Sequence, residues 1–371
     1  ESRHTMSRPL KYLTAALLWA AVAGYIIWSA AAAHRQRAAR EVTRLVVDVR
    51  DSTSQGHLVS TAQVRSWIGR SGLKTVGAKV GEVDLRGIER LIADNGFVSR
   101  VDAYVRYDGT LHVDIRQRRP LLRMLTDGWN SYVTQEGFAF AAPRSSSLYV
   151  PVVTGSYRPP FPASYSGPVR DYVDGRIEEI DRRIEELERE KYPYFRRELQ
   201  NDENIRALRR MRIKRRWWRF ESEKEFEERV EKLRSHKADL RRSYRYEARL
   251  VQEGIEAVAA RQEAERRKQK KLEKSYEDFT KLLTFVEFLE EDDFWRSEVV
   301  QIVAHTAPSG ALEVELIPRS GRFRILFGRI ERVDEKFDLL ADFYRRGLGR
   351  LGWDEFATVS VQYRGRVVCR K

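Results

Sequence analysis

The chain has 371 residues, a formal net charge of +14 and a charged fraction of 33%. That length predicts two or three domains rather than one, and the positive charge predicts attraction to anionic surfaces such as nucleic acid, lipid headgroups or acidic partners. The only cysteine is Cys369, which excludes an intrachain disulfide and a cysteine-based metal site.

A long uncharged segment, Tyr12 to Ala33, follows a short N-terminal tail of residues 1–11. As a helix it would be about 33 Å long, enough to cross a hydrocarbon core of about 30 Å, so residues 12–33 are predicted to span a membrane. A cleavable signal peptide is the alternative, because the alanines at the end of the segment fit a cleavage site, but the apolar run is longer than such signals need. Positive charges lie on both sides of the span and leave its orientation open.

Residues 42–117 are predicted to form a compact α+β unit, because short apolar runs of strand and helix period follow one another closely. Asp108–Gly109 has the composition of a tight hairpin turn between two alternating strands. The expected elements are a strand at 45–49, a helix from Ser60–Thr61 to Gly72, a helix from Val83 to Asn95–Gly96, and strands at 98–107 and 111–115.

A β domain is predicted over residues 118–172 and 276–371. Neither half has enough strands to close a sheet alone, so we expect one domain interrupted by an insertion. Helices are expected from Phe279 to Phe288 and from Glu335 to Leu348. The expected strands are 121–125, 131–134, 137–140, 150–153, 299–304, 312–317, 323–327 and 358–368.

The intervening residues 173–275 are highly charged and contain almost no glycine or proline. Such a composition is typical of solvent-exposed helices or of disorder. Apolar residues recur every three or four positions, as in Ile177, Ile180 and Ile184, so we expect two or three long charged helices, with disorder of part of the segment as the alternative.

No enzyme chemistry is indicated by the sequence. The six histidines are scattered, none of them in a metal-ligand spacing, and no glycine-rich loop ends in the residues of a phosphate cradle. The acidic run from Glu290 to Asp293 has no paired acid nearby in the sequence and fits a helix end. We therefore expect no catalytic residue, no cofactor, no metal and no small-molecule substrate.

One basic patch with interleaved aromatic residues is the most unusual part of the insertion. A solvated helix face explains it equally well, but such residues can also bind an anionic surface through phosphate contacts and interfacial tryptophans. Lipid or an envelope polymer is the preferred ligand, and nucleic acid becomes the preferred one if this segment is cytoplasmic. The patch comprises Arg209, Arg210, Arg212, Lys214, Arg215, Arg216, Trp217, Trp218 and Arg219.

Several short segments, taken in their order and spacing, resemble the FtsQ/DivIB cell-division family in the form found in Bacteroidetes-type bacteria. Two departures stand out: Gly96 replaces an expected proline, and residues 173–275 have no counterpart in the family pattern. The segments that carry the resemblance are 83–98, 109–120, 150–155, 293–295, 314–319, 335–337, 352–353 and 367–369.

The resemblance implies an α+β fold in which a single transmembrane helix precedes a POTRA-like module and a mixed β domain with a long charged helical insertion. It implies a non-catalytic scaffold at the division septum that links other single-span divisome proteins, FtsB- and FtsL-like, through periplasmic contacts. The expected location is the inner membrane, with residues 1–11 in the cytoplasm and the C-terminus in the periplasm; nucleic acid is not expected as a partner.

The resemblance also implies that a partner segment binds at the last strand, by adding a strand to an exposed sheet edge. An exposed edge offers unpaired N–H and C=O groups, and alternate side chains give specificity. The expected partner-binding residues are Phe356, Val359, Val361 and Tyr363, although Val359 and Val361 fit a core position equally well.

Two other functions stay open at this point. A POTRA-bearing protein of secretion or outer-membrane assembly would need a following barrel with long lipid-facing strands, which the short strands do not resemble. A membrane-tethered nucleic-acid binder would use the basic patch and would show salt-dependent binding to DNA.

Overall fold

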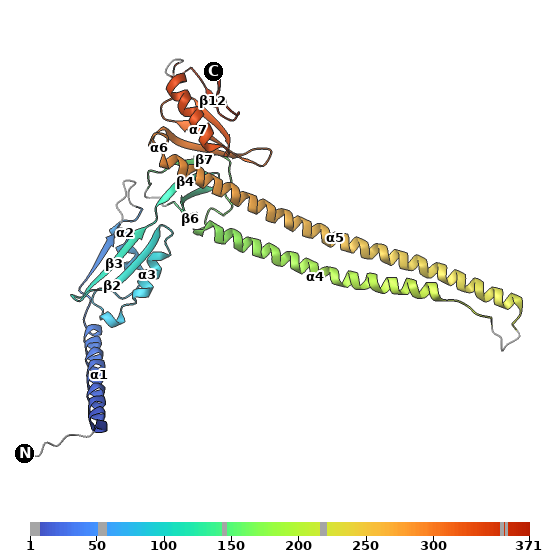
Figure 1. Ribbon diagram of the computed structural model, residues 1–371, viewed down its shortest axis with the longest axis horizontal. Helices are drawn as coiled ribbons and strands as arrows, with labels where there is room; N and C mark the ends of the chain where they lie inside the picture. The colour runs from blue at the N-terminus through green and yellow to red at the C-terminus, as the bar shows by residue number, and fades with distance from the viewer. Residues whose placement is uncertain (1–7, 51–57, 143–146, 216–220, 349–351, 353–354) are drawn as a thin grey trace, which may run out of the picture. The chain divides into compact units, whose positions relative to one another are not determined.

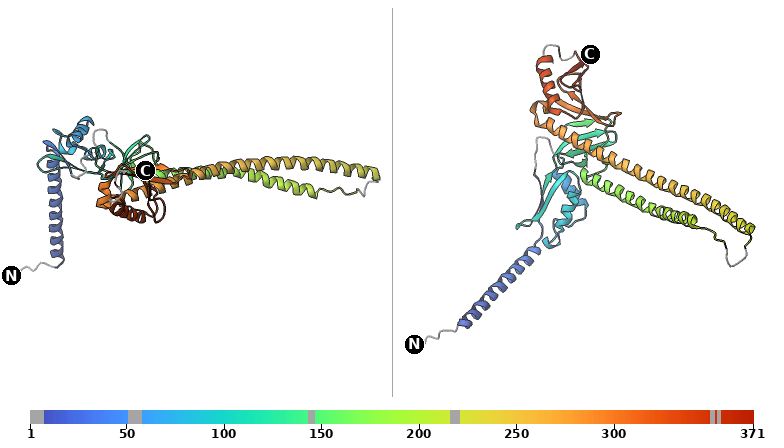
Figure 2. Two further views of the ribbon diagram at one scale, coloured as in Figure 1. Left: turned by 90° about the horizontal axis from the view of Figure 1, so that it is seen from above. Right: turned by 45° about the vertical axis from the view of Figure 1, so that its right-hand side comes forward.

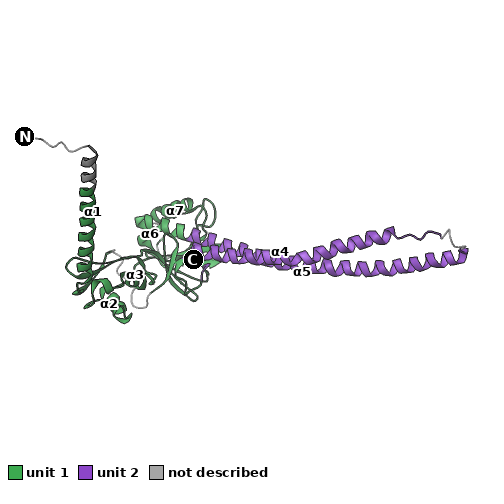
Figure 3. Cartoon of the chain, turned by 90° about the horizontal axis from the view of Figure 1, so that it is seen from below, with its two compact units in different colours: residues 1–158, 162–167, 283–371 green, residues 159–161, 168–282 purple. Residues whose placement is uncertain are grey.

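The computed structural model describes residues 8–50, 58–142, 147–215, 221–348, 352 and 355–371. The chain divides into two compact units (Figure 3). The first unit contains Glu1–Arg158, Pro162–Gly167 and Leu283–Lys371, and the second contains Pro159–Phe161 and Pro168–Leu282.

The chain begins with a long apolar helix, α1, Arg8–Ala38. Within it, Leu17–Ala38 is long and apolar enough to cross a membrane, and most of its side chains face outward. This stretch overlaps the predicted span at residues 12–33 and extends it by one basic turn at the C-terminal end.

A three-stranded sheet with two helices follows α1 (Figure 1). Its strands lie in the order β1-β3-β2, with β1 parallel and β2 antiparallel to β3. The predicted strand, two helices and hairpin are all present. The elements are β1 Arg44–Val49, α2 Thr61–Arg70, the 3-10 turn η1 Val80–Glu82, α3 Leu85–Ala93, β2 Val98–Val105 and β3 Thr110–Gln117.

Side-chain caps and an apolar face explain where these two helices form. The Ser60 hydroxyl accepts a hydrogen bond from the Gln63 N–H at the start of α2, and the Asp84 carboxylate accepts one from the Gly87 N–H at the start of α3. Ile88 and Ile92 are fully buried, four residues apart on one face of α3, in the same apolar core as the β3 side chains. Each buried isoleucine contributes roughly 1.5–3 kcal/mol.

A second sheet has ten strands among the described residues, in the order β13-β12-β11-β10-β9-β7-β4-β5-β6-β8. Strand β7 pairs in parallel with β4 on one side and with β9 on the other, so residues from both sides of the insertion build one sheet. The predicted α+β fold with an interrupted β domain is therefore confirmed. The strands are β4 Pro120–Thr126, β5 Trp129–Thr134, β6 Phe138–Ala141, β7 Val152–Thr154, β8 Gly167–Pro168, β9 Val299–Thr306, β10 Leu312–Pro318, β11 Arg324–Arg329, β12 Thr358–Ser360 and β13 Val368–Arg370.

An aromatic cluster joins the C-terminal half of this sheet to its helices α6 (Asp293–Glu298) and α7 (Val333–Asp342). Phe337 lies at its centre, with ring centroids 4.9 Å from Trp295 and 5.2 Å from Phe327. The helix expected at 335–348 is α-helical only to Asp342 and continues as a π-helix, η2, over Phe343–Leu348. In η2, the buried Tyr344 donates a hydrogen bond to the Glu298 carboxylate at 3.1 Å.

The prediction of a single strand at residues 358–368 is wrong. The chain forms two three-residue strands, β12 and β13, which pair with each other in antiparallel fashion. Gly365 between them adopts a φ of 65°, a left-handed conformation that turns the chain back. The regular alternation of apolar residues concealed this turn.

The insertion consists of two long helices, α4 (Val169–Arg210) and α5 (Glu223–Glu291), which lie side by side in both views of Figure 2. They run antiparallel: the Asn201 amide donates to the Tyr244 carbonyl at 2.9 Å, and the Gln262 amide donates to the Ile184 carbonyl at 3.2 Å. The expected boundary at residues 275/276 lies inside α5, whose last residues, from Leu283, belong to the first unit.

The residues of α4 that face its partner follow a heptad pattern, with steps of three, four or seven. This spacing is that of an antiparallel coiled coil. The buried or half-buried members are Val173, Ile177, Ile180, Ile184, Leu187, Tyr194, Asn201, Ile205 and Leu208.

A substitution at Gly155 tests the close approach of β7 to β9. It has a φ of 105°, and a Cβ there would overlap the Ala304 carbonyl oxygen of β9. We expect Gly155→Ala to lower the free energy of unfolding of the first unit by about 2 kcal/mol or more. The measurement is limited proteolysis of the detergent-solubilised chain across a urea series.

Gly175→Ala is the matched control for this substitution. Gly175 lies inside α4 with open space at its Cβ position. Alanine there should raise the free energy of unfolding of the second unit by about 0.5–1 kcal/mol, because glycine is the poorer helix former. Equal effects of the two substitutions would contradict the described packing.

Candidate partner-binding site

The four predicted partner-binding residues divide between the core and the surface. Val359, in β12, and Val361, just after it, are both fully buried, and β12 has a neighbour on each side, β11 and β13. Strand β13 is the edge strand at this end of the sheet. These two valines therefore occupy the core position that was their alternative interpretation.

Phe356 and Tyr363 remain accessible. Phe356 is half-buried, with its ring 6.3 Å from that of Phe343 in η2. Tyr363 lies in the turn between β12 and β13, is 47% exposed, and has the Arg366 guanidinium 5.5 Å from its ring. An exposed aromatic ring beside an arginine, next to an edge strand, has the composition of a protein-binding surface.

A buried lysine supports the turn that carries Tyr363. The Lys336 ammonium group donates hydrogen bonds to the Phe327 carbonyl at 2.9 Å and to the Arg329 carbonyl at 2.7 Å, on either side of Gly328. Gly328 has a φ of 73°, and the Gln362 side chain lies against the position where a Cβ would stand. Lys336 thus fixes the backbone on which the residue before Tyr363 rests.

Burial lowers the pKa of Lys336 to about 8, from an ordinary value of 10.5. Sequence reasoning placed Lys336 in a family segment, 335–337, but gave it no role. A lysine on an amphipathic helix is normally exposed, so no signal in a single sequence identifies it as buried.

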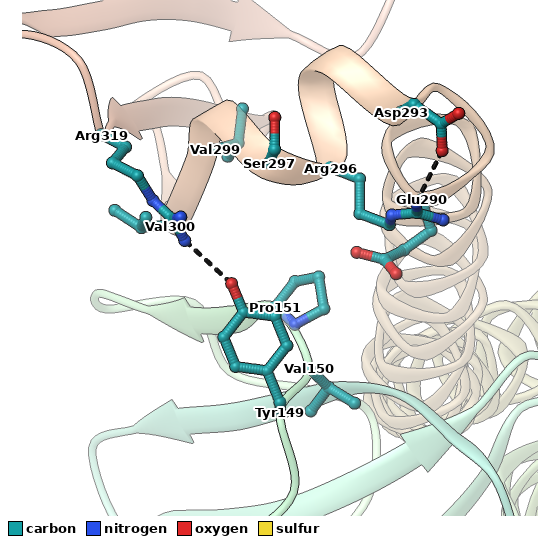
Figure 4. A pocket seen from close by; sticks show the side chains of 10 residues that line it. All are labelled: Tyr149, Val150, Pro151, Glu290, Asp293, Arg296, Ser297, Val299, Val300 and Arg319. Atoms are coloured by element: carbon teal, nitrogen blue, oxygen red, sulfur yellow. Dashed lines mark hydrogen bonds and ion pairs between the residues drawn. The ribbon is translucent and has the colours of Figure 1, made fainter. Parts of the chain in front are cut away.

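A cleft of about 520 Å³ lies beside strand β9 (Figure 4). The Arg319 guanidinium donates to the Tyr149 hydroxyl at 2.8 Å, and Arg296 pairs with Asp293 at 2.6 Å. Partial burial raises the pKa of the Glu290 carboxyl. The lining residues are Tyr149, Val150, Pro151, Glu290, Asp293, Arg296, Ser297, Val299, Val300 and Arg319.

Three of the segments that carry the family resemblance, 150–155, 293–295 and 314–319, contribute to the walls of this cleft. The cleft combines two arginines and two carboxylates with the exposed side chains of Tyr149 and Val300. Such a lining suits a protein segment rather than a metal, and no group of three potential metal ligands occurs among the described residues. Sequence reasoning did not predict this cleft, because its walls come from parts of the chain far apart.

The basic patch of the insertion is only partly described. Arg209 and Arg210 end α4, Arg212 and Lys214 follow it, and all four are exposed. Arg215 pairs with Glu223 at 3.6 Å. The other members of the predicted patch, Arg216, Trp217, Trp218 and Arg219, lie outside the described residues.

Together, α1, the three-stranded module and the β domain define a protein with an N-terminal apolar helix, a POTRA-like module and a C-terminal β domain. Residues 40–116 match the family model "POTRA-like domain", and residues 253–370 match "FtsQ/DivIB, C-terminal related". Both matches support an FtsQ/DivIB family protein. No curated protein matches it.

These family matches support a cell-division scaffold, and the N-terminal apolar helix fits a single-pass membrane protein. FtsQ/DivIB is a family of non-catalytic division scaffolds, which is consistent with the absence of enzyme motifs in the sequence. The second match begins at residue 253, inside α5. The last part of the insertion therefore does have a counterpart in the family, contrary to the expectation from the sequence.

Lys336→Met tests the buried lysine through its pH dependence. Because the folded-state pKa is the lower one, the unfolded chain holds this proton between about pH 8 and 10.5 and the folded chain does not. Stability therefore rises with pH across that window, by about 3 kcal/mol at most. Methionine is similar in size and does not titrate, so the variant should lack this rise.

The measurement for Lys336 is the urea midpoint of the first unit at pH 7.5, 9 and 10.5, for the original chain and the variant in parallel. Other lysines and tyrosines titrate equally in both proteins, so only the difference between the two curves reports on Lys336. Parallel curves would show that the lysine is not buried as described.

Proposed function

We propose that this protein is a scaffold of the bacterial division septum that binds other single-span division proteins, FtsB- and FtsL-like, in the periplasm. The observation that carries the proposal is the edge strand β13 inside the region that matches the FtsQ/DivIB C-terminal model. In this proposal the chain is a single-pass inner-membrane protein with a cytoplasmic N-terminus and a periplasmic C-terminus. It acts by holding partners together and performs no chemistry.

The proposed mode of binding is the addition of a partner strand to β13. The Arg370 carbonyl accepts a hydrogen bond from the Ala357 N–H and so faces inward. Backbone groups alternate in direction along a strand, so the N–H and C=O of Cys369 face the open edge. These groups would bond to a partner strand, while Tyr363 and Phe356 would contact its side chains.

Cys369→Pro tests strand addition directly. Proline removes the N–H that faces the open edge and is tolerated on edge strands, so the sheet should stay folded while partner binding falls at least about tenfold. The measurement is co-purification of the full chain with its membrane-protein partners from detergent extracts of dividing cells. Cys369→Ser keeps the N–H and should bind normally.

Tyr363→Ala tests the side-chain contribution. Because about half of the Tyr363 surface is exposed, its loss should weaken partner binding by about 1–2 kcal/mol and leave folding unchanged. If the partners co-purify with both the Cys369→Pro and the Tyr363→Ala variants as they do with the original chain, this edge is excluded as the binding site.

For the insertion we propose that the cations of its basic patch contact an anionic component of the envelope, either lipid or polymer. Arg209, Arg210, Arg212 and Lys214 are exposed, and none of them pairs with an acid among the residues described. Clustered cations at one place bind polyanions through release of counterions.

The test of the patch is Arg209→Glu with Arg210→Glu. The matched control is Arg196→Glu with Arg197→Glu, two exposed arginines elsewhere on α4 that give the same change in net charge. Nanodisc-embedded chain is mixed with anionic vesicles in one arm and with cell-wall sacculi in the other. Only the patch variant should lose salt-sensitive binding, either to the vesicles or to the sacculi. Equal binding by both variants would contradict the proposed contact. Retention on DNA in place of either would favour the nucleic-acid-binding alternative.

A further inference from the structure

We propose that the tip of the β2–β3 hairpin is a membrane-binding element, with the Tyr107 ring among the headgroups of the membrane that α1 crosses. Anionic phospholipids are the proposed ligand, held by the neighbouring arginines Arg35, Arg37 and Arg40. This contact requires only the membrane span and holds for either orientation of the chain, so it does not depend on the division role.

The covalent chain brings the hairpin close to the membrane. The uncharged run ends at Ala33, and α1 continues as a helix to Ala38. At about 1.5 Å per residue, Arg40 lies within about 10 Å of the edge of the hydrocarbon core. The headgroup layer on each side is about 5–8 Å thick, so a residue that packs on Arg40 lies at or near headgroup level.

Tyr107 is that residue. The Arg40 guanidinium donates to the Tyr107 carbonyl at 2.8 Å and stacks over its ring, 4.5 Å from the centroid. The same turn is also bonded through its backbone, since the Thr43 N–H donates to the Gly109 carbonyl at 2.9 Å. The hairpin tip cannot leave the exit of the membrane helix without breaking all three contacts.

Gly109 makes this close approach possible. It has a φ of 81°, and a Cβ there would lie 2.9 Å from the Glu41 carbonyl oxygen, closer than side chains normally come. The turn residues Asp108 and Gly109 therefore place the hairpin tip directly against residues 41–43, the first residues after the basic end of α1.

Packing within the three-stranded module does not explain why Tyr107 is exposed. Its side chain is 74% exposed, although most large apolar side chains described for residues 40–116 lie in the core. Tyrosine is enriched at membrane interfaces, because its ring prefers the apolar side of the headgroup layer and its hydroxyl prefers water. A membrane surface would cover this ring without further change of fold.

The charges around the tip favour an anionic surface. Residues 34–44 and the tip residues 106–110 together contain five arginines and two acids, Glu41 and Asp108. The Asp108 carboxylate accepts a hydrogen bond from the Thr110 N–H, which holds its pKa below the usual range. Arginines beside a membrane span bind anionic lipid headgroups. The arginines are Arg35, Arg37, Arg40, Arg44 and Arg106.

The experiment uses the full chain, with its cysteine removed by Cys369→Ser, in nanodiscs that contain lipids with a nitroxide on the headgroup. A fluorophore is attached through Arg106→Cys, next to Tyr107, or through Ser99→Cys, an exposed residue at the opposite end of β2. The two labels are about 25 Å apart along the strand. Quenching of the fluorophore reports its distance from the headgroups.

We expect the label at residue 106 to be quenched at least about twofold more than the label at residue 99, and more strongly in phosphatidylglycerol than in phosphatidylcholine. Adding Tyr107→Ser to the Arg106→Cys chain should lower that quenching without abolishing it, because the ring no longer anchors the tip in the headgroups while the backbone contacts to Arg40 and Thr43 remain.

Two results would overturn the proposal. One is equal quenching at residues 106 and 99, which would place the tip away from the headgroups. The other is quenching at residue 106 that responds neither to Tyr107→Ser nor to lipid charge. That result would show that the tip is near the membrane only because it is attached to α1, without binding the lipid. Limited proteolysis of each variant confirms that the module is folded, and Tyr107 contributes little buried area to that fold.

Discussion

The parallel pairing of β7 with β9 is the interaction on which the rest of the β domain depends. Val153 of β7 pairs with Ile302 of β9, and the Gln301 amide donates to the Thr154 hydroxyl at 2.7 Å. These strands are separated in sequence by the whole charged insertion, yet they are neighbours in one sheet. The cost of closing a loop grows only slowly with its length, so a long insertion is tolerated where the two sheet halves pack well. All of the C-terminal strands, including the edge at β13, are held in place through this pairing.

The elements set by local chemistry were predictable from the sequence. The hairpin around Asp108–Gly109, the caps at Ser60 and Asp84 and the spacing of Ile88 and Ile92 each depend on residues close together in the chain. The same holds for the heptad spacing of α4. In these places local preference and tertiary packing favour the same structure, so a pattern seen in one sequence is sufficient.

The candidate site was less predictable, because it depends on contacts between distant residues. Val359 and Val361 alternate as residues of an edge strand would, but β13 is the edge strand beyond β12 and both valine side chains are buried. Lys336 resembles a surface lysine in sequence, yet two carbonyl groups of β11 hold it in the interior. The cleft beside Tyr149 and Arg319 is formed by residues that are 170 positions apart. Family resemblance pointed to the end of the sheet that carries β13, and the structure distinguishes the accessible residues there, Phe356 and Tyr363, from the buried valines.

The proposed function is that of a membrane-anchored division scaffold whose C-terminal sheet offers an edge to its partners on the periplasmic side. Its most direct test is the location of the C-terminus in dividing cells, read from a C-terminal reporter that is active only outside the cytoplasm together with a fluorescent fusion. The account predicts an active periplasmic reporter and a fluorescent signal concentrated at the septum. A cytoplasmic C-terminus, or a uniform membrane signal in dividing cells, would contradict it.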